Sequence, residues 1–229
     1  MDKKKLTLKM QIRQEYYRVK ELLDGKRPSR MDLFTYMDDE IYRICVSGSH
    51  AKENPFQHYL DFLYELGELS EDEQELYAGI GREFIQTIET TEMQKVYKMP
   101  ILYSFYNHGN IRLAVTDEEV LESWKEFFDT GTNWKDFPNV NTYEDYKKVT
   151  DKQHLSKAKR MPIRFLKASG KGFFVEKNGY ALALRDEIGE VVGNMVFGEQ
   201  MGDVLGYRGL EYYRRRYEVD LKRVKNSYR

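Results

Sequence analysis

The stretch of sequence that decides the fold is MPIRFLKASGKGFFVEKNGYALAL, residues 161–184. Apolar residues flank Asn178-Gly179 on both sides: Phe173, Phe174 and Val175 before it, and Tyr180, Leu182 and Leu184 after it. Asn-Gly between two such runs is the strongest short-range signal for a β-hairpin with a type I′ turn. The sequence therefore predicts an antiparallel hairpin over residues 173–184.

A basic helix is predicted immediately before this hairpin, over residues 155–168, either interrupted or initiated at Pro162. A basic helix that leads into a short hairpin is the order of elements in a winged-helix module, which we place at about residues 143–190. In such a module the helix can enter a major groove while hairpin cations contact phosphates. The alternative is a structural hairpin that only completes a core.

In most of the remaining chain, apolar residues recur at intervals of three and four, which predicts helices. Before residue 95 we expect helices over residues 6–23, from Ser29 through Ile44, over 56–66 ending at Gly67, and from Ser70 through Ile88. After it the apolar run of residues 101–106 fits a short helix or a strand, and a helix with Pro100 in its first turn is favoured. We also expect a helix capped by Thr116 and another over residues 143–149. In residues 111–115 apolar and polar side chains alternate, which is typical of a β-strand. Because a lone hairpin is marginal, this strand should pair with it.

These elements predict an α+β fold that is predominantly α-helical. Residues 1–95 form a helical domain, and residues 96–229 form an α+β domain with a small antiparallel sheet, the winged-helix-like hairpin and a basic carboxy-terminal helix.

Charge is segregated along the chain although the formal net charge is only −1. Residues 1–30 carry ten Lys or Arg against four acids, residues 31–93 carry three against fifteen, and residues 143–173 carry nine against three. Such blocks allow one cationic and one anionic face, or charges that pair within the molecule.

The cations of the second domain are the candidate nucleic-acid contacts. Arg160, Arg164 and Lys167 have the spacing of one helix face, which we expect to be exposed. In the terminal helix, tyrosines at 207, 212, 213 and 217 alternate with arginines and could stack on unpaired bases or dock on the core. The predicted contacts are Lys157, Lys159, Arg160, Arg164, Lys167, Lys171, Lys177, Arg214, Arg215 and Arg216.

No catalytic, metal-binding or cofactor-binding constellation is recognisable, so we expect a protein that is not an enzyme and has no small-molecule substrate. The four histidines are scattered, Cys45 is the single cysteine and is expected in the core, and no phosphate-binding loop occurs. No apolar run reaches the roughly 18–20 residues of a membrane helix, and no signal-peptide core follows Met1. We therefore expect a cytoplasmic protein without a membrane partner.

Several segments resemble the carboxy-terminal accessory region of bacterial DEAD/DEAH-box superfamily 2 helicases, many of which also carry a phospholipase-D-like nuclease domain. The segments are Gly25–Phe34, Glu89–Met93, Lys98–Leu102, Phe105–Asn110, Lys125–Phe128, Met161–Leu166 and Phe173-Phe174. The chain departs from these helicases in lacking the GxxxxGK[ST] loop, the DExH box and the HxK pair, so neither ATP hydrolysis nor nuclease activity follows.

The resemblance implies an accessory nucleic-acid-binding module that acts with a helicase or nuclease domain in cis or in trans, on DNA rather than RNA. The alternative is a protein-interaction module whose acidic half docks on an ATPase motor or nuclease subunit without contacting nucleic acid.

Overall fold

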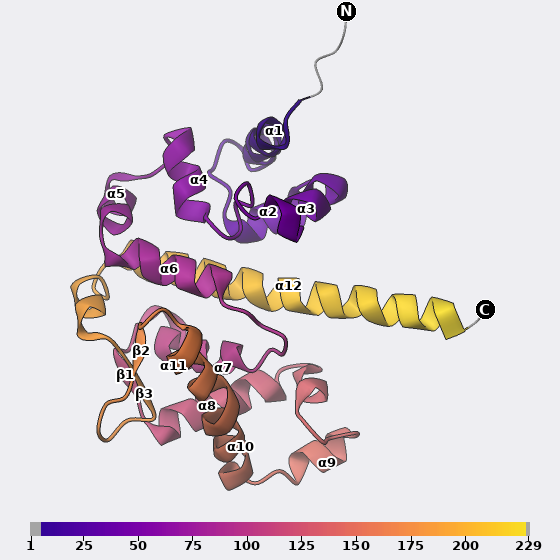
Figure 1. Cartoon of the computed structure of the whole chain (residues 1–229), viewed down its shortest axis with the longest axis vertical. Coiled ribbons are helices and arrows are strands. Elements are labelled where there is room, and N and C mark those ends of the chain that lie inside the picture. Colours follow the sequence, from indigo (N-terminus) through magenta and orange to yellow (C-terminus); the bar gives the residue numbers. More distant parts are fainter. Residues whose placement is uncertain (1–5, 228–229) are drawn as a thin grey trace, which may run out of the picture. The chain divides into compact units, whose positions relative to one another are not determined.

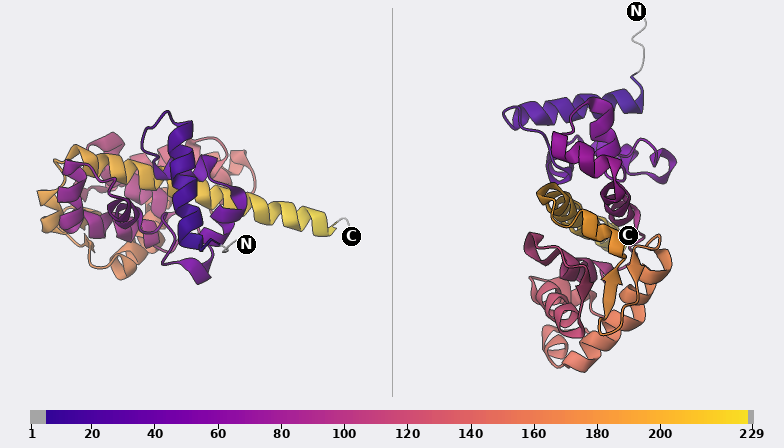
Figure 2. Two further views of the ribbon diagram at one scale, coloured as in Figure 1. Left: turned by 90° about the horizontal axis from the view of Figure 1, so that it is seen from above. Right: turned by 90° about the vertical axis from the view of Figure 1, so that its left-hand side faces the viewer.

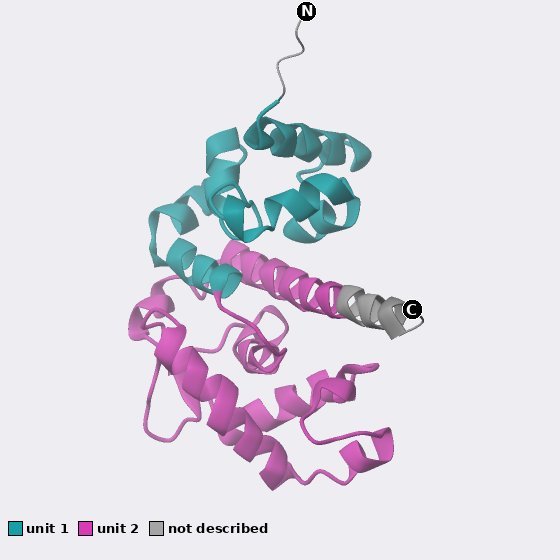
Figure 3. Cartoon of the chain, turned by 45° about the vertical axis from the view of Figure 1, so that its right-hand side comes forward, with its two compact units in different colours: residues 1–90 teal, residues 91–229 magenta. Residues whose placement is uncertain are grey.

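The computed structural model describes the backbone of residues 6–227 and the side chains of residues 6–216. The chain divides into two units, residues 1–90 and 91–229 (Figure 3). The domain boundary predicted after residue 95 lies in the segment that leads from the last helix of the first unit to the first helix of the second.

The regular secondary structure of the first unit's described part is all helical, as the sequence predicts. Its core includes Ile12, Leu33, Phe56, Leu63 and Phe84. The α-helices are α1 (Leu8–Leu22), α2 (Arg30–Tyr36), α3 (Asp39–Cys45), α4 (Tyr59–Leu66), α5 (Glu71–Ala78) and α6 (Ile80–Thr90), with one 3₁₀ turn at Gly48–His50.

The predicted helix boundaries at polar caps are confirmed. The Ser29 side chain accepts a hydrogen bond from the Asp32 backbone while the Asp32 carboxylate accepts one from the Ser29 backbone, and Ser70 with Glu73 repeats this capping box. Gly67 ends α4 in the left-handed conformation, with φ of 70°.

Two of the predicted helices are each divided into two shorter helices, so the prediction that they are continuous is wrong. The chain is extended at Met37, and Asp38 Oδ1 accepts hydrogen bonds from the backbone nitrogens of Glu40 (2.9 Å) and Ile41 (3.1 Å), which begins α3 anew. Gly79 is extended as well and separates α5 from α6. In both places the apolar periodicity continues across the break, which concealed it.

The second unit contains three strands among its helices (Figure 1). Its α-helices are α7 (Lys98–Tyr106), α8 (Asp117–Asp129), α9 (Tyr143–Lys147), α10 (Asp151–Ala158), α11 (Arg164–Ser169) and α12 (Met195–Ser227), with 3₁₀ turns at Asn107–Gly109, Asn133–Asp136 and Asp186–Glu190. The helix with Pro100 in its first turn is confirmed as α7. Figures 1 and 2 show α12 as one continuous helix.

The strands β1 (Ala114–Val115), β2 (Phe174–Val175) and β3 (Leu182–Leu184) form an antiparallel sheet of order β1-β3-β2. Val115 opposes Leu182, and Phe174 opposes Leu184. The pairing of the hairpin with a third strand is thereby confirmed, and β3, as the central strand, is buried along its length.

The predicted type I′ turn is wrong. Tyr180 N donates to Lys177 O at 3.1 Å, which places Asn178-Gly179 at the centre of a turn. Only Gly179 of that pair has a positive φ, 84°, whereas a type I′ turn requires a positive φ at both central residues. A positive φ at the second central residue alone is the pattern of a type II turn.

The strand register follows from this turn. Val175 opposes Ala183, whereas a two-residue loop at Asn178-Gly179 would have placed Leu182 opposite Val175. One additional residue therefore lies in the connection, and the hairpin ends in a wider loop at residues 176–181.

The predicted basic helix is interrupted at Pro162, not initiated there. A π-helical segment, Lys159–Ile163, joins α10 to α11 and contains Pro162. Proline has no backbone N–H and its ring crowds the preceding turn, so a wider turn accommodates it inside a helix. The whole fold is α+β and predominantly α-helical, and none of the described helices has the length and apolar character of a bilayer span.

Candidate nucleic-acid interface

A groove of about 1010 Å³ lies in the second unit along the interrupted basic helix. One wall comes from α10, the π-helical segment and the start of α11, and the other comes from residues 137–149. The groove is lined by Phe137, Pro138, Asn139, Val140, Asp145, Lys148, Val149, Lys152, Gln153, Ser156, Lys157, Arg160, Met161, Arg164 and Phe165.

The helical wall owes its charge to the spacing of its cations. Lys157, Arg160 and Arg164 recur at intervals of three and four residues, which keeps them on the same side of the chain through the π-helical segment. Arg160 and Arg164 are exposed and Lys157 is half-buried, with its Nζ 5.5 Å from the centre of the Tyr97 ring. This side of the helix is therefore a continuous cationic edge.

The electrostatics of the groove favour an anion. Among the described residues that line it there are five cations, Lys148, Lys152, Lys157, Arg160 and Arg164, and one carboxylate, Asp145. Burial and the charge of Arg160 lower the pKa of Lys157. A cation whose neighbour disfavours its own charge is stabilised when an anion approaches.

Asp145 is the one carboxylate of this lining, and it has local partners. Thr142 Oγ1 donates to its Oδ2 at 2.8 Å, and Lys148 Nζ lies 3.2 Å from its Oδ1. These two contacts, with the Thr142 hydrogen bond first, lower the pKa of Asp145. The carboxylate remains ionised at neutral pH and offsets part of the charge of Lys148.

Apolar and aromatic groups share the groove with these cations. Phe165 is 43% exposed, and the guanidinium carbon of Arg164 lies 5.2 Å from the centre of its ring. Val140, Val149 and Met161 add aliphatic surface. The groove thus combines charge with a flat, accessible aromatic ring.

The structure distributes the predicted site residues over several places. Lys157, Arg160 and Arg164 come together in the groove. Lys171 is exposed in the turn after α11, with φ of 50°. The other predicted residues form intramolecular ion pairs or lie on α12.

Three predicted contacts are paired with acids of the same unit. Lys159 Nζ lies 2.6 Å from Asp117 Oδ2, Lys167 forms an ion pair with Glu176, and Lys177 Nζ lies 3.8 Å from Asp186 Oδ1. None of these three partners belongs to the acidic block of residues 31–93.

The prediction that Arg160, Arg164 and Lys167 form one exposed face needs a correction for Lys167. Lys167 lies outside the groove lining, and Lys157 takes its place beside the two arginines. Lys167 instead forms an ion pair with Glu176, which directly follows β2, so its ammonium group is held at the hairpin and not at the groove.

The carboxy-terminal cations lie on α12. Arg215 pairs with Glu211, Arg216 pairs with Asp136, and Arg214 is half-buried.

The tyrosines of α12 whose side chains the structure describes pack toward the core, which was the alternative to stacking on bases. Tyr207 and Tyr212 are buried, Tyr213 is half-buried, and Tyr212 Oη donates to Asp136 Oδ1 at 3.1 Å. The side chain of Tyr217 lies outside the described residues. The helix therefore uses these two tyrosines to pack on its own unit.

The groove residues that were not predicted as contacts include two cations and one exposed aromatic residue: Lys148, Lys152 and Phe165. The two lysines had been counted in the basic block 143–173, but nothing in the sequence indicated that residues 137–149 fold back along the helix. The exposure of Phe165 carried no sequence signal, because an aromatic residue in an apolar helix segment is usually buried.

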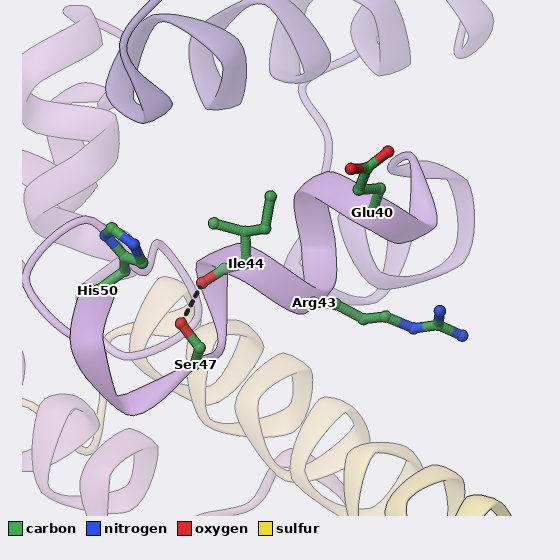
Figure 4. A pocket seen from close by; sticks show the side chains of 5 residues that line it. All are labelled: Glu40, Arg43, Ile44, Ser47 and His50. Carbon is green, nitrogen blue, oxygen red and sulfur yellow. Dashed lines mark hydrogen bonds between the residues drawn. The ribbon is translucent and has the colours of Figure 1, made fainter.

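Other candidate sites have weaker geometry. A shallow hollow of the first unit is lined by Glu40, Arg43, Ile44, Ser47 and His50, and Figure 4 shows Glu40 and Arg43 extending away from His50. The Ser47 hydroxyl donates to the Ile44 carbonyl at 2.7 Å, so its proton is used locally. These side chains do not converge on a common point.

Cys45 is buried in the core of the first unit, as predicted, and burial raises the pKa of its thiol to about 12. Such a thiol is protonated at neutral pH and is a poor nucleophile. Across the part of the chain that the structure describes, no three His, Cys, Asp or Glu residues gather as metal ligands would.

Comparison of the chain with protein-family models, with curated proteins and with solved structures finds no match. The geometry and charge of the groove therefore carry the functional argument.

Proposed function

We propose that this protein binds nucleic acid, DNA rather than RNA, through the groove of its second unit, as a non-catalytic accessory module of a helicase or nuclease. The observation that carries the proposal is the ratio of five cations to one carboxylate among the described residues of the groove lining. Phosphate backbones require cations at regular spacing, and their neutralisation supplies most of the affinity of such modules.

The order of elements in the second unit supports the proposal. Apart from α9 and the 3₁₀ turns, the elements run α7, β1, α8, the interrupted helix α10–α11 and the β2–β3 hairpin, which is the order of a winged-helix module. The strand order β1-β3-β2, with the first strand paired to the last, agrees with that arrangement. This argument is an analogy between folds, and the groove supplies its chemistry.

The helicase-like segments support the choice of DNA and of the partner. They include Met161–Leu166, from which the groove takes Met161, Arg164 and Phe165. A module of this kind would hold a strand near a motor or nuclease domain that performs the chemistry.

A second candidate function is docking on a protein partner through the first unit. Its residues 6–90 carry ten Lys or Arg against seventeen Asp or Glu. Tyr64, which is 59% exposed, stacks on Tyr77 with ring centres 4.6 Å apart. An acidic surface with exposed aromatic rings suits a basic protein surface and would repel nucleic acid.

A salt titration of binding tests the first function against the second. Fluorescence anisotropy with the full chain and a labelled DNA should show an affinity that falls steeply between 50 and 200 mM salt. Replacing both Arg160 and Arg164 with glutamine should weaken binding about 10- to 100-fold at low salt and reduce the logarithmic salt slope by about 1.4–1.8.

The matched control removes two cations outside the groove, Arg43→Gln with Lys95→Gln, both of which are exposed. This control has the same net charge as the groove variant, so it should bind almost as the unchanged protein does. Equal losses in both variants would indicate a diffuse charge effect, and absence of binding at low salt would reject the proposal.

A further inference from the structure

We infer that the groove takes a single strand and stacks an unpaired base on Phe165. This inference rests on the proposed function and adds to it the form of the nucleic acid. Three observations carry it: the wall that faces the cationic edge, the mixture of charged and apolar lining, and the exposed aromatic ring.

The first observation concerns the shape of the site. A helix reads duplex DNA as a convex ridge inserted into a major groove about 12 Å wide. Here the cationic side of α10 and α11 faces a wall made by residues 137–149, which includes Val140 and Lys148. The cationic edge is therefore one side of a concavity, and a major groove cannot close around it without displacing that wall.

The second observation concerns what the groove offers to a ligand. A duplex backbone presents phosphates and sugars, for which cations suffice. This lining adds Val140, Val149, Met161 and Phe165 to the cations. Interleaved cations and aromatic or apolar groups are the combination found where a protein holds unpaired bases, because every base has a flat face that is free only in a single strand.

The third observation is the state of Phe165. Its ring is 43% exposed at the rim of the groove, with the Arg164 guanidinium 5.2 Å from the ring centre. A stacked base would cover this ring while Arg164 contacts the adjacent phosphate. Both faces of each base in a duplex are already stacked on neighbours, so duplex DNA offers the ring no equivalent partner.

The dimensions of the cationic edge indicate the length of strand. From Lys152 to Arg164 the chain would rise about 18 Å as a continuous α-helix at ~1.5 Å per residue, which is an upper bound because part of it is π-helical. A strand with phosphates at least ~3.4 Å apart would place about five nucleotides, or fewer when extended, along this distance. Affinity should therefore increase with oligonucleotide length and level off near about five nucleotides.

The test compares two labelled probes with the full chain: a 20-nucleotide oligothymidine strand, which has little internal stacking, and a 20-base-pair duplex. At 50 mM salt the single strand should bind more tightly than the duplex. Phe165→Ala should weaken single-strand binding about 5- to 150-fold, leave duplex binding unchanged and leave the salt slope unchanged. Phe165→Trp should retain single-strand affinity because it keeps a stacking surface.

Tyr36→Ala is the matched control, since Tyr36 is an aromatic residue of similar exposure, 47%, in the first unit. Thermal unfolding of each variant checks that the fold is retained. Equal or tighter duplex binding, or single-strand binding unaffected by Phe165→Ala, would overturn the inference while the proposed function stood. If neither probe binds, the proposed function itself fails.

Discussion

Replacing Arg30 with methionine removes one half of a fully buried ion pair in the first unit. Arg30 and Glu89 are 0% and 2% exposed, and the Arg30 Nε and Nη2 atoms lie 2.9 and 2.6 Å from Glu89 Oε1. The Tyr59 backbone nitrogen also donates to Oε1, at 3.2 Å, and the Tyr59 ring lies 4.4 Å from the Arg30 guanidinium carbon. The pair thus joins α2, α4 and α6.

The magnitude follows from leaving a carboxylate in the core without its cation. Breaking a buried pair on one side costs about 3–5 kcal/mol, whereas removing both charges is often nearly neutral. Arg30→Met alone should therefore lower the free energy of unfolding by about 4 kcal/mol. Adding Glu89→Gln, which keeps an acceptor for the Tyr59 nitrogen, should restore at least half of that loss.

Urea unfolding followed by circular dichroism measures these changes. With a slope of about 2 kcal/mol per molar urea, the single variant should shift the midpoint of the first unit's transition by about 2 M. Hydrogen exchange of α2 and α6 assigns the loss to this unit.

The pH dependence of the same variant provides an independent check. Burial raises the pKa of Glu89 even beside Arg30, and without Arg30 that pKa must rise further. A carboxyl group whose pKa is higher in the folded than in the unfolded state favours folding at low pH, and this contribution is lost as the pH rises through the folded-state pKa. The destabilisation should therefore be smaller at pH 5 than at pH 7.5. A loss below about 1 kcal/mol, or a double variant no more stable than the single one, would refute the reasoning.

Three further perturbations test the second unit. Asp145→Asn should tighten nucleic-acid binding about two- to fivefold at low salt, measured by anisotropy, because it frees Lys148 while an amide can still accept the Thr142 hydrogen bond. His154 is buried, and this burial is the main reason why its pKa is lowered in the folded state, whereas in the unfolded chain the same imidazole has a pKa of ~6.5. Thermal unfolding should therefore show that stability falls as the pH drops below that value, and His154→Phe should reduce this fall. Gly170→Ala should cost about 1–3 kcal/mol in urea unfolding, since its Cβ would lie 2.5 Å from the Leu166 carbonyl oxygen and 2.4 Å from the Phe174 ring.

Features determined by neighbouring residues could be predicted from the sequence. The Ser29, Ser70 and Thr116 caps, the left-handed Gly67 and the strand that joins the hairpin all follow from local chemistry and periodicity. The breaks at Asp38 and Gly79 did not follow. At both positions a local backbone preference overrode an apolar pattern that continued without interruption.

The groove could be predicted only in part, for a different reason. Its helical wall follows from the spacing of Lys157, Arg160 and Arg164, but its opposite wall requires knowing where residues 137–149 fold. That position is fixed by long-range contacts: the Tyr97 hydroxyl donates to the Asp136 carbonyl at 2.8 Å, and the Phe137 ring packs 4.9 Å from the His154 ring. Contacts between residues so far apart in sequence leave no periodic signal in the segments that make them.

The wall made by residues 137–149 turns one side of the interrupted basic helix into a groove. Lys167 does not extend the cationic edge, because it pairs with Glu176, and without residues 137–149 that edge would face solvent as a convex ridge. A convex basic ridge suits a duplex, whereas a walled edge with Phe165 at its rim suits an unpaired strand. Under the proposed function, residues 137–149 between α8 and α10, and not the number of cations, would set the preference for a single strand.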